Sequence, residues 1–209
     1  MQEYLNKYHH ELRNYWIKSF INSDGSVLDV GCGVGKLLKE LPNKRKVGID
    51  NDEKYISYAE KYNNNNDNHA SFFLHDIDAD SFSYKETFDT VICSEVLEHV
   101  KNPDIVIERL FMMSKEWVII SIPTYKSLLC VKTWYECEEH INYFDIDKIT
   151  RMVSKYGVIT RISGTRFITI PSRIAWFIKP LLFFFDKKLN EKYWCQHHGF
   201  HTIIKVRKK

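Results

Sequence analysis

The sequence predicts an α/β protein built on a doubly wound, mostly parallel sheet. Two observations carry this prediction. Short apolar segments alternate with segments of helical periodicity along most of the chain, and a glycine-rich turn follows the first apolar segment. Because consecutive parallel strands are joined by crossover helices, this alternation indicates one sheet with helices on both faces.

The elements follow from periodicity and from boundary residues. Helices are expected over residues 4–21, 34–41, 52–62, 103–113 and 145–156. Strands are expected over residues 26–30, 46–49, 71–74, 88–93, 116–122, 158–162 and 200–206. Asp52 and Asp145 are suitable N-caps, Asn102 with Pro103 is a helix-start pair, and Gly157 is expected to close the last helix.

The chain length favours a single domain over residues 1–209, since 209 residues with 44% hydrophobic content can bury one substantial core. Residues 1–22 form an N-terminal helical cap in this interpretation. Residues 124–140 and 164–199 are rich in aromatic side chains and interrupt the alternation. We interpret both as insertions near the acceptor side of a site at the sheet edge.

Composition argues against several classes of protein. The net charge is only +3, from 30 basic and 27 acidic side chains, so wholesale nucleic-acid binding is not indicated. The start of the chain lacks a signal-peptide core, and the longest apolar run, 174–185, is shorter than the ~20 residues that cross a bilayer. Five cysteines without a CxxC pair suit reduced thiols. We therefore expect a cytoplasmic protein.

The turn VLDVGCGVGKLL, at residues 27–38, suggests a ligand that approaches the backbone closely. A dinucleotide fingerprint would need a glycine where Lys36 stands, and a P-loop would need one at Val30 and a hydroxyl at Leu37. What remains is D-x-G-x-G-x-G from Asp29 to Gly35. This pattern resembles motif I of the class I S-adenosylmethionine-dependent methyltransferases.

Later motifs support the resemblance over roughly residues 8–160. It implies a seven-stranded Rossmann-like sheet with an antiparallel last strand. Asp50 stands where the family places an acid on the ribose hydroxyls, and Asp76 where it holds the adenine amino group. Arg13 in HHELRNYW would pair with the donor carboxylate, or is a solvated residue of an amphipathic helix. The full expected set for S-adenosylmethionine is Arg13, Asp29, Gly31, Cys32, Gly33, Asp50, Asn51, Asp76, Ile77, Cys93 and Ser94.

The segment SEVLEHV, with a histidine further along the chain, holds the candidate catalytic residues. His99 and His140 could act as the base for a hydroxyl acceptor. If SEVLEHV is helical, Glu95, Glu98 and His99 share one face, and with His140 they could bind a divalent metal. This E-x-x-E-H set resembles metal-binding residues of ubiquinone-biosynthesis O-methyltransferases and of small-RNA 3′-terminal 2′-O-methyltransferases. The alternative is that these residues bind no metal and only make contacts that stabilise the fold.

A second metal site, for zinc, is an alternative. It would combine Cys137 and His140 with Cys195, His197 or His198, although the spacing is loose. Ordinary core or surface roles explain the same residues.

The predicted function is therefore S-adenosylmethionine-dependent methylation, most simply on oxygen, of a small or lipid-like acceptor. A metal-dependent RNA 3′-terminal 2′-O-methyltransferase and a non-catalytic donor-binding protein are the alternatives. The aromatic segment 174–195 could cover an apolar substrate, form a dimer face, contact a membrane surface, or pack on the sheet edge.

Overall fold

The computed structural model describes residues 2–63, 70–124, 140–165, 184 and 201–209, with side chains from residue 11 onward. Most of the two predicted insertions, and with them Cys137, Cys195, His197 and His198 of the alternative zinc site, lie outside the described residues. The aromatic segment 174–195 also lies outside them, apart from Phe184.

The described elements agree closely with those expected from the sequence. The helices are α1 (Gln2–Phe20), α2 (Lys36–Lys39), α3 (Glu53–Asn63), α4 (Pro103–Met113) and α5 (Ile146–Ser154). The strands are β1 (Val27–Val30), β2 (Lys46–Asp50), β3 (Ser71–Leu74), β4 (Phe88–Ser94), β5 (Ser114–Pro123), β6 (Gly157–Thr165) and β7 (His201–Lys208).

Several boundaries differ by a few residues, and the difference at Gly157 has a clear physical reason. Gly157 does not close a helix, because α5 already ends at Ser154 and Gly157 is the first residue of β6. A Cβ at this position would lie 2.4 Å from the carbonyl oxygen of Arg207 on the paired strand. The glycine is therefore explained by close approach of two backbones rather than by a helix end.

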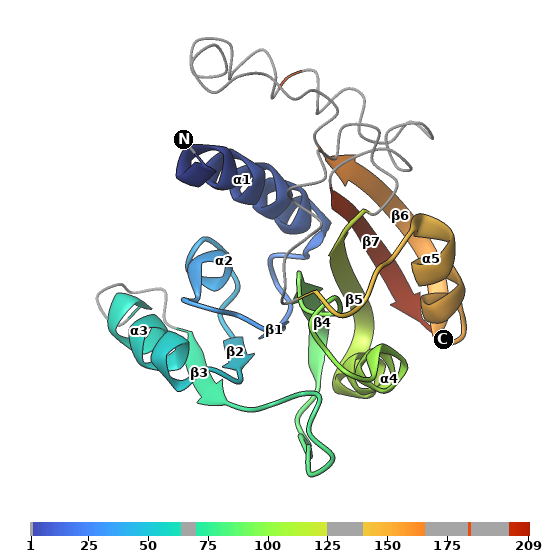
Figure 1. Ribbon diagram of the computed structural model, residues 1–209. Helices are drawn as coiled ribbons and strands as arrows, with labels where there is room; N and C mark the ends of the chain where they lie inside the picture. Colours follow the sequence, from blue (N-terminus) through green and yellow to red (C-terminus); the bar gives the residue numbers. More distant parts are fainter. Residues whose placement is uncertain (1, 64–69, 125–139, 166–183, 185–200) are drawn as a thin grey trace.

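The strands form one seven-stranded sheet in the order β3-β2-β1-β4-β5-β7-β6 (Figure 1). Strands β3, β2, β1, β4 and β5 run parallel to one another, whereas β7 runs antiparallel to both β5 and β6. The doubly wound, mostly parallel sheet and its antiparallel last strand are confirmed.

Two apolar layers fix helices on both faces of the sheet (Figure 1). One layer joins the sheet to α1, α2 and α3 through residues such as Leu12, Leu38 and Ile56, which are almost fully buried. The other joins it to α4 and α5 through residues such as Leu110 and Ile149. Within the described part of the chain, none of the helices combines the length and the apolar character that a membrane crossing requires.

Helix starts provide a test of the local signals. The side chain of Asp145 accepts a hydrogen bond of 2.7 Å from the amide of Lys148, whereas Asn102 makes no side-chain capping bond to α4. We expect Asp145→Ala to lower the free energy of unfolding by about 1 kcal/mol. Asn102→Ala is the control and should change it by less than about 0.5 kcal/mol in the same urea titration. Equal losses in the two variants would contradict this assignment of the caps.

Candidate functional site

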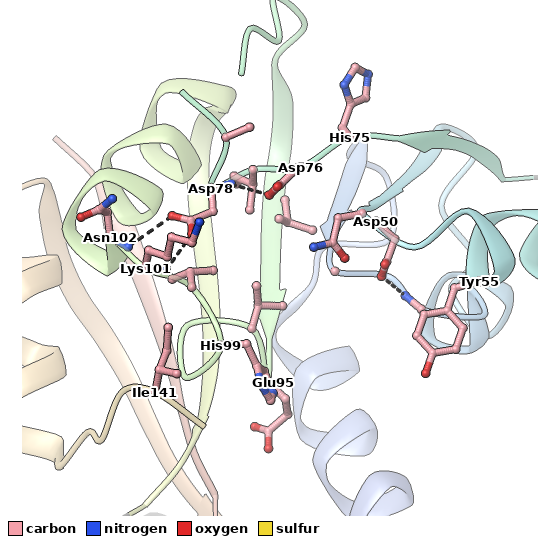
Figure 2. Close-up of a pocket in the computed structure, with 18 of the residues that line it drawn as sticks. Asp50, Tyr55, His75, Asp76, Asp78, Glu95, His99, Lys101, Asn102 and Ile141 are labelled. Atoms are coloured by element: carbon pink, nitrogen blue, oxygen red, sulfur yellow. Dashed lines mark hydrogen bonds between the residues drawn. The ribbon is translucent and has the colours of Figure 1, made fainter. Parts of the chain in front are cut away.

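A cavity of about 860 Å³ opens at the carboxyl ends of β1, β2, β3 and β4. This is the edge where doubly wound sheets bind ligands, because the strand–helix turns meet there. Figure 2 shows Asp50 and Tyr55 together on one side, Asp78 with Lys101 and Asn102 opposite, and His99 beside Glu95 at another end. The volume of the cavity is within the range of small-molecule and cofactor sites.

The glycine turn forms one wall of the cavity through two left-handed residues. Gly31 has a φ of 72°, and a Cβ there would lie 2.2 Å from Cγ2 of Val96. Gly33 has a φ of 51°, and a Cβ there would project into open space. The first glycine is therefore required by packing, whereas the second leaves the backbone accessible to a ligand.

Asp50 fixes this turn from the end of the neighbouring strand. Its carboxylate accepts hydrogen bonds from the amides of Gly33, at 2.8 Å, and of Asp52, at 3.0 Å. Each oxygen keeps a further lone pair, since a carboxylate accepts about four hydrogen bonds in all. Asp50 can therefore hold the turn and bind a ligand hydroxyl at the same time.

The loop after β3 supplies a second acidic wall. Asp76 accepts a hydrogen bond of 2.9 Å from the amide of Asp78, and Asp78 in turn accepts from the amides of Lys101, at 2.7 Å, and Asn102, at 3.2 Å. Arg109 anchors the loop by donating to the carbonyl oxygen of Ala79 at 2.9 Å. The loop is thus fixed from both sides before any ligand binds.

A buried charge lies close to the glycine turn. Asp29 is only 3% exposed, and burial raises the pKa of its carboxyl to about 7, while Arg13 opposes the rise and Asp50 adds to it. A buried carboxylate is costly unless a cation compensates it. A cationic ligand would relieve this cost.

The predicted donor residues divide into two groups. Those that line the cavity are Gly31, Gly33, Asp50, Asn51, Asp76 and Ile77. Within the described part of the chain, Arg13, Asp29, Cys32, Cys93 and Ser94 are not on the wall. Burial raises the pKa of both thiols, Cys32 and Cys93, above its usual range, so they are inert packing groups here.

The segment SEVLEHV is not helical, because Ser94 ends β4, the chain bends at Glu95 and residues 97–99 form a turn. Glu95 has a φ of 58°, in the left-handed region, so its side chain does not share a helical face with Glu98 and His99. Its carboxylate accepts from Ser121 Oγ at 2.7 Å and lies 3.0 Å from Nδ1 of His201. Burial favours a raised pKa for Glu95, but His201, Arg13 and Ser121 outweigh burial and hold it below its usual range.

The other three candidate metal ligands do come together. One ligand atom from each of Glu98, His99 and His140 lies within 4.8 Å of the others, and the rings of the two histidines are 4.8 Å apart at their centroids. Backbone bonds explain the meeting, because the amides of Ile141 and Asn142 donate to the carbonyl oxygen of Glu98 at 2.9 and 3.0 Å.

Glu98 is the buried member of this trio. It is 1% exposed, and its Oε2 has no hydrogen-bond partner within the described residues. Burial, and secondarily the charge of Glu95, raise the pKa of Glu98 well above its usual range. An unpaired buried oxygen beside two imidazoles fits a divalent cation, and this is the observation that supports such a site.

Several residues of the site were not predicted. Tyr55, His75, Asp78, Lys101 and Asn102 line the cavity. Asp78 had a signal, since it follows a predicted strand end in HDID, and Tyr55 lies in the first turn of the helix after Asp50. His201 had no signal in the sequence, because its approach to Glu95 depends on how distant strands pair.

Comparison with known proteins places this geometry in a family. A family model described as "Methyltransferase domain" matches residues 1–158. The chain belongs to the class I S-adenosylmethionine-dependent methyltransferases. The matched range includes the glycine turn and all the residues that line the cavity.

Curated relatives are similar over part of their length. A ubiquinone biosynthesis O-methyltransferase from Pseudomonas fluorescens (strain Pf0-1) is 35% identical over 107 residues, which are 50% of this chain and 46% of that protein. The protein of that name from Hydrogenovibrio crunogenus is 31% identical over 125 residues, 56% and 52% of the two chains. The chain therefore spans about half the length of the curated relatives it matches.

Solved structures share the fold. A methyltransferase from Thermotoga maritima, a possible histamine N-methyltransferase, has a TM-score of 0.68 at 16% sequence identity. The match covers 97% of this chain and 89% of the Thermotoga chain. Magnesium protoporphyrin IX methyltransferase from Synechocystis PCC 6803, with bound S-adenosylhomocysteine, has a TM-score of 0.67 at 19% sequence identity. The match covers 100% of this chain and 87% of the Synechocystis chain. At these identities the likeness concerns the fold alone.

The buried Asp29 predicts a pH dependence of stability. Its folded pKa of about 7 lies above the usual value of 3.8, so the unfolded chain releases this proton first as pH rises. The stability of the wild type should fall by up to a few kcal/mol between about pH 4 and 7 from this group. Asp29→Asn removes the effect, so the variant should gain stability relative to wild type as pH rises. Denaturant unfolding at pH 4.5 and pH 8 measures it, with Asp52→Asn as the control.

Proposed function

We propose that this protein binds S-adenosylmethionine in the cavity and transfers its methyl group to a hydroxyl of a small or lipid-like acceptor. The observation that carries the proposal is the carboxylate of Asp50 at the cavity wall, tied to the open glycine turn by the 2.8 Å bond from Gly33. A carboxylate there suits the two hydroxyls of a ribose.

The chemistry of the wall fits the donor. Gly33 leaves room at the backbone, Asp50 and Asp76 are acceptors, and Ile77 offers an apolar surface that is suitable for a purine. The wall carries five carboxylates, those of Asp50, Asp76, Asp78, Asp80 and Glu95, and they favour a positively charged ligand over a phosphate. Arg13 would pair with the donor carboxylate.

The donor, when bound, supplies an activated methyl group that a nucleophile can attack directly. The chain then has to hold an acceptor oxygen in line with this methyl group, since positioning accounts for roughly 7–11 kcal/mol of barrier lowering in such reactions. His99 lies on the cavity wall with His140 beside it, and we propose that one of them accepts the hydroxyl proton.

The acceptor class is supported by the relatives rather than by the cavity. The curated relatives are O-methyltransferases of ubiquinone biosynthesis, and we extend oxygen as the acceptor atom from them to this chain. The aromatic segment 174–195 is consistent with an apolar acceptor.

Replacing Asp50 tests the donor site. Asp50→Asn should weaken binding of S-adenosylhomocysteine about 10–100-fold, because hydrogen bonds to a charged group contribute roughly 1.5–3 kcal/mol. Asp52→Asn is the matched control, since it removes a neighbouring charge but keeps an oxygen that can cap α3. Isothermal titration calorimetry measures both.

Two results would contradict the proposal. One is binding of NAD or ATP in preference to S-adenosylhomocysteine, and the other is an unchanged affinity in Asp50→Asn. Tight donor binding without methyl transfer to any hydroxyl acceptor would instead favour a non-catalytic donor-binding protein.

A metal-dependent version of the reaction is the second candidate. Glu98, His99 and His140 are the residues that would hold a divalent ion, and the unpaired buried Oε2 of Glu98 favours it. Such an ion would bind and acidify an acceptor hydroxyl. An RNA 3′-terminal ribose would be an acceptor of this kind, as would a catechol-like small molecule.

The geometry makes a selective prediction for metal binding. Glu98→Gln and His140→Ala should each weaken Mn²⁺ binding about 10-fold or more, since each removes one of three ligands. Glu95→Gln should leave Mn²⁺ affinity within about 3-fold of wild type, because Glu95 is held by His201 and Ser121 instead. Calorimetry with Mn²⁺ measures all three. An equal loss in all three variants would restore Glu95 to the metal site, and no Mn²⁺ binding by the wild type would remove the candidate.

A further inference from the structure

Glu95 is fixed at the junction between the cavity and the last strand. Its amide donates to the carbonyl oxygen of Ser121 at 2.9 Å, and its Oε1 accepts from the hydroxyl of the same serine at 2.7 Å. A left-handed backbone at a non-glycine residue costs about 1–3 kcal/mol and persists where the surroundings impose it. The side chain is therefore held in one place by β5.

The second oxygen of Glu95 faces two side chains, a histidine and an arginine. Oε2 lies 3.0 Å from Nδ1 of His201 and 3.8 Å from Nη1 of Arg13. The 3.0 Å separation is a hydrogen-bonding distance for an N–H of His201, and the contact is also an ion pair when the imidazole is protonated. Because Coulomb attraction grows as the separation shrinks, His201 is the stronger partner of the two.

Arg13 is consequently only partly engaged. Its side chain is 13% exposed, its one ion pair within the described residues is the long one to Glu95, and its buried Nε makes no hydrogen bond there. A half-buried guanidinium whose buried Nε has no partner among the described residues favours a further anionic partner. Its Nη1 lies 3.8 Å from Glu95, just beyond the end of β4, and its charge lowers the pKa of both Asp29 and Glu95.

We propose that His201 is a positioning residue for the donor site: by holding Glu95, it keeps Arg13 available for the carboxylate of S-adenosylmethionine. The inference rests on the proposed function. Without His201, Glu95 would have Arg13 as its nearest cation, and a donor carboxylate would have to compete with a tightened buried ion pair. Breaking such a pair is costly, so donor affinity falls.

The pair His201→Leu and His201→Asn tests the inference, because leucine and asparagine have nearly the same size and branching. Asparagine keeps an N–H donor near the position of Nδ1, whereas leucine does not. We expect His201→Leu to bind S-adenosylhomocysteine about 10-fold more weakly than wild type, and His201→Asn to stay within about 3-fold. Calorimetry measures the affinities, and thermal unfolding checks that each variant is folded.

The choice of ligand separates this role from a general structural one. 5′-Methylthioadenosine keeps the adenosine and the sulfur but lacks the amino-acid end, so it makes no use of Arg13. Its affinity should be the same in wild type, His201→Leu and His201→Asn. A loss of both ligands in His201→Leu would show that the histidine supports the site as a whole and would overturn the inference.

Glu95→Gln provides the second arm. It removes the anion that competes for Arg13, so the single variant should bind S-adenosylhomocysteine at least as tightly as wild type, and adding it to His201→Leu should restore the affinity. If His201→Leu does not fold, a weaker affinity in Glu95→Gln alone would overturn the inference. Unchanged binding in a folded His201→Leu would do so as well, with the proposed function intact. Failure of the wild type to bind S-adenosylhomocysteine would overturn both.

Discussion

The hydrogen bonds accepted by Asp50 are the interaction on which the site depends. One carboxylate joins the turn after β1 to the start of α3, because it accepts the amides of Gly33 and Asp52. Strands β1 and β2 are parallel neighbours, so the turns that follow them reach the same edge of the sheet. A ligand that enters the cavity meets a turn already fixed by the protein, which reduces the entropy cost of binding.

Buried charge at this edge is the second constraint. Asp29, Glu95 and Glu98 are held within a few residues of the cavity, and each meets the cost of burial differently. Burial raises the pKa of Asp29 to about 7, Glu95 is ion-paired, and one oxygen of Glu98 has no partner among the residues that the structure describes. Such a concentration of perturbed carboxyl groups is typical of functional sites, since a folding core would replace them with apolar residues.

Local signals explain why so much of the fold could be predicted. Strand ends, caps and the glycine turn are each encoded over a few residues. From these signals the sheet could be predicted, together with four residues of the cavity wall, Gly31, Gly33, Asp50 and Asp76. The E-x-x-E-H spacing failed because three- and four-residue spacing is compatible with a helix and with consecutive turns. In the structure the carbonyl oxygen of Glu98 accepts hydrogen bonds from the amides of residues 141 and 142, and this contact spans more than 40 residues of sequence.

His201 illustrates the same limit, because its place at the site depends on strand pairing between distant parts of the chain. As the first residue of an antiparallel strand, it lies at the edge where the parallel strands end, paired with Pro123 and Thr165. Thr165 and His201, the described residues on either side of 166–200, are paired at this edge of the sheet, and Thr124 and His140 are the first and last residues of the other predicted insertion. The donor side is thus built by the sheet and its turns. We expect acceptor selection to vary through the segments attached at this edge, which can change without disturbing Asp50 or the glycine turn.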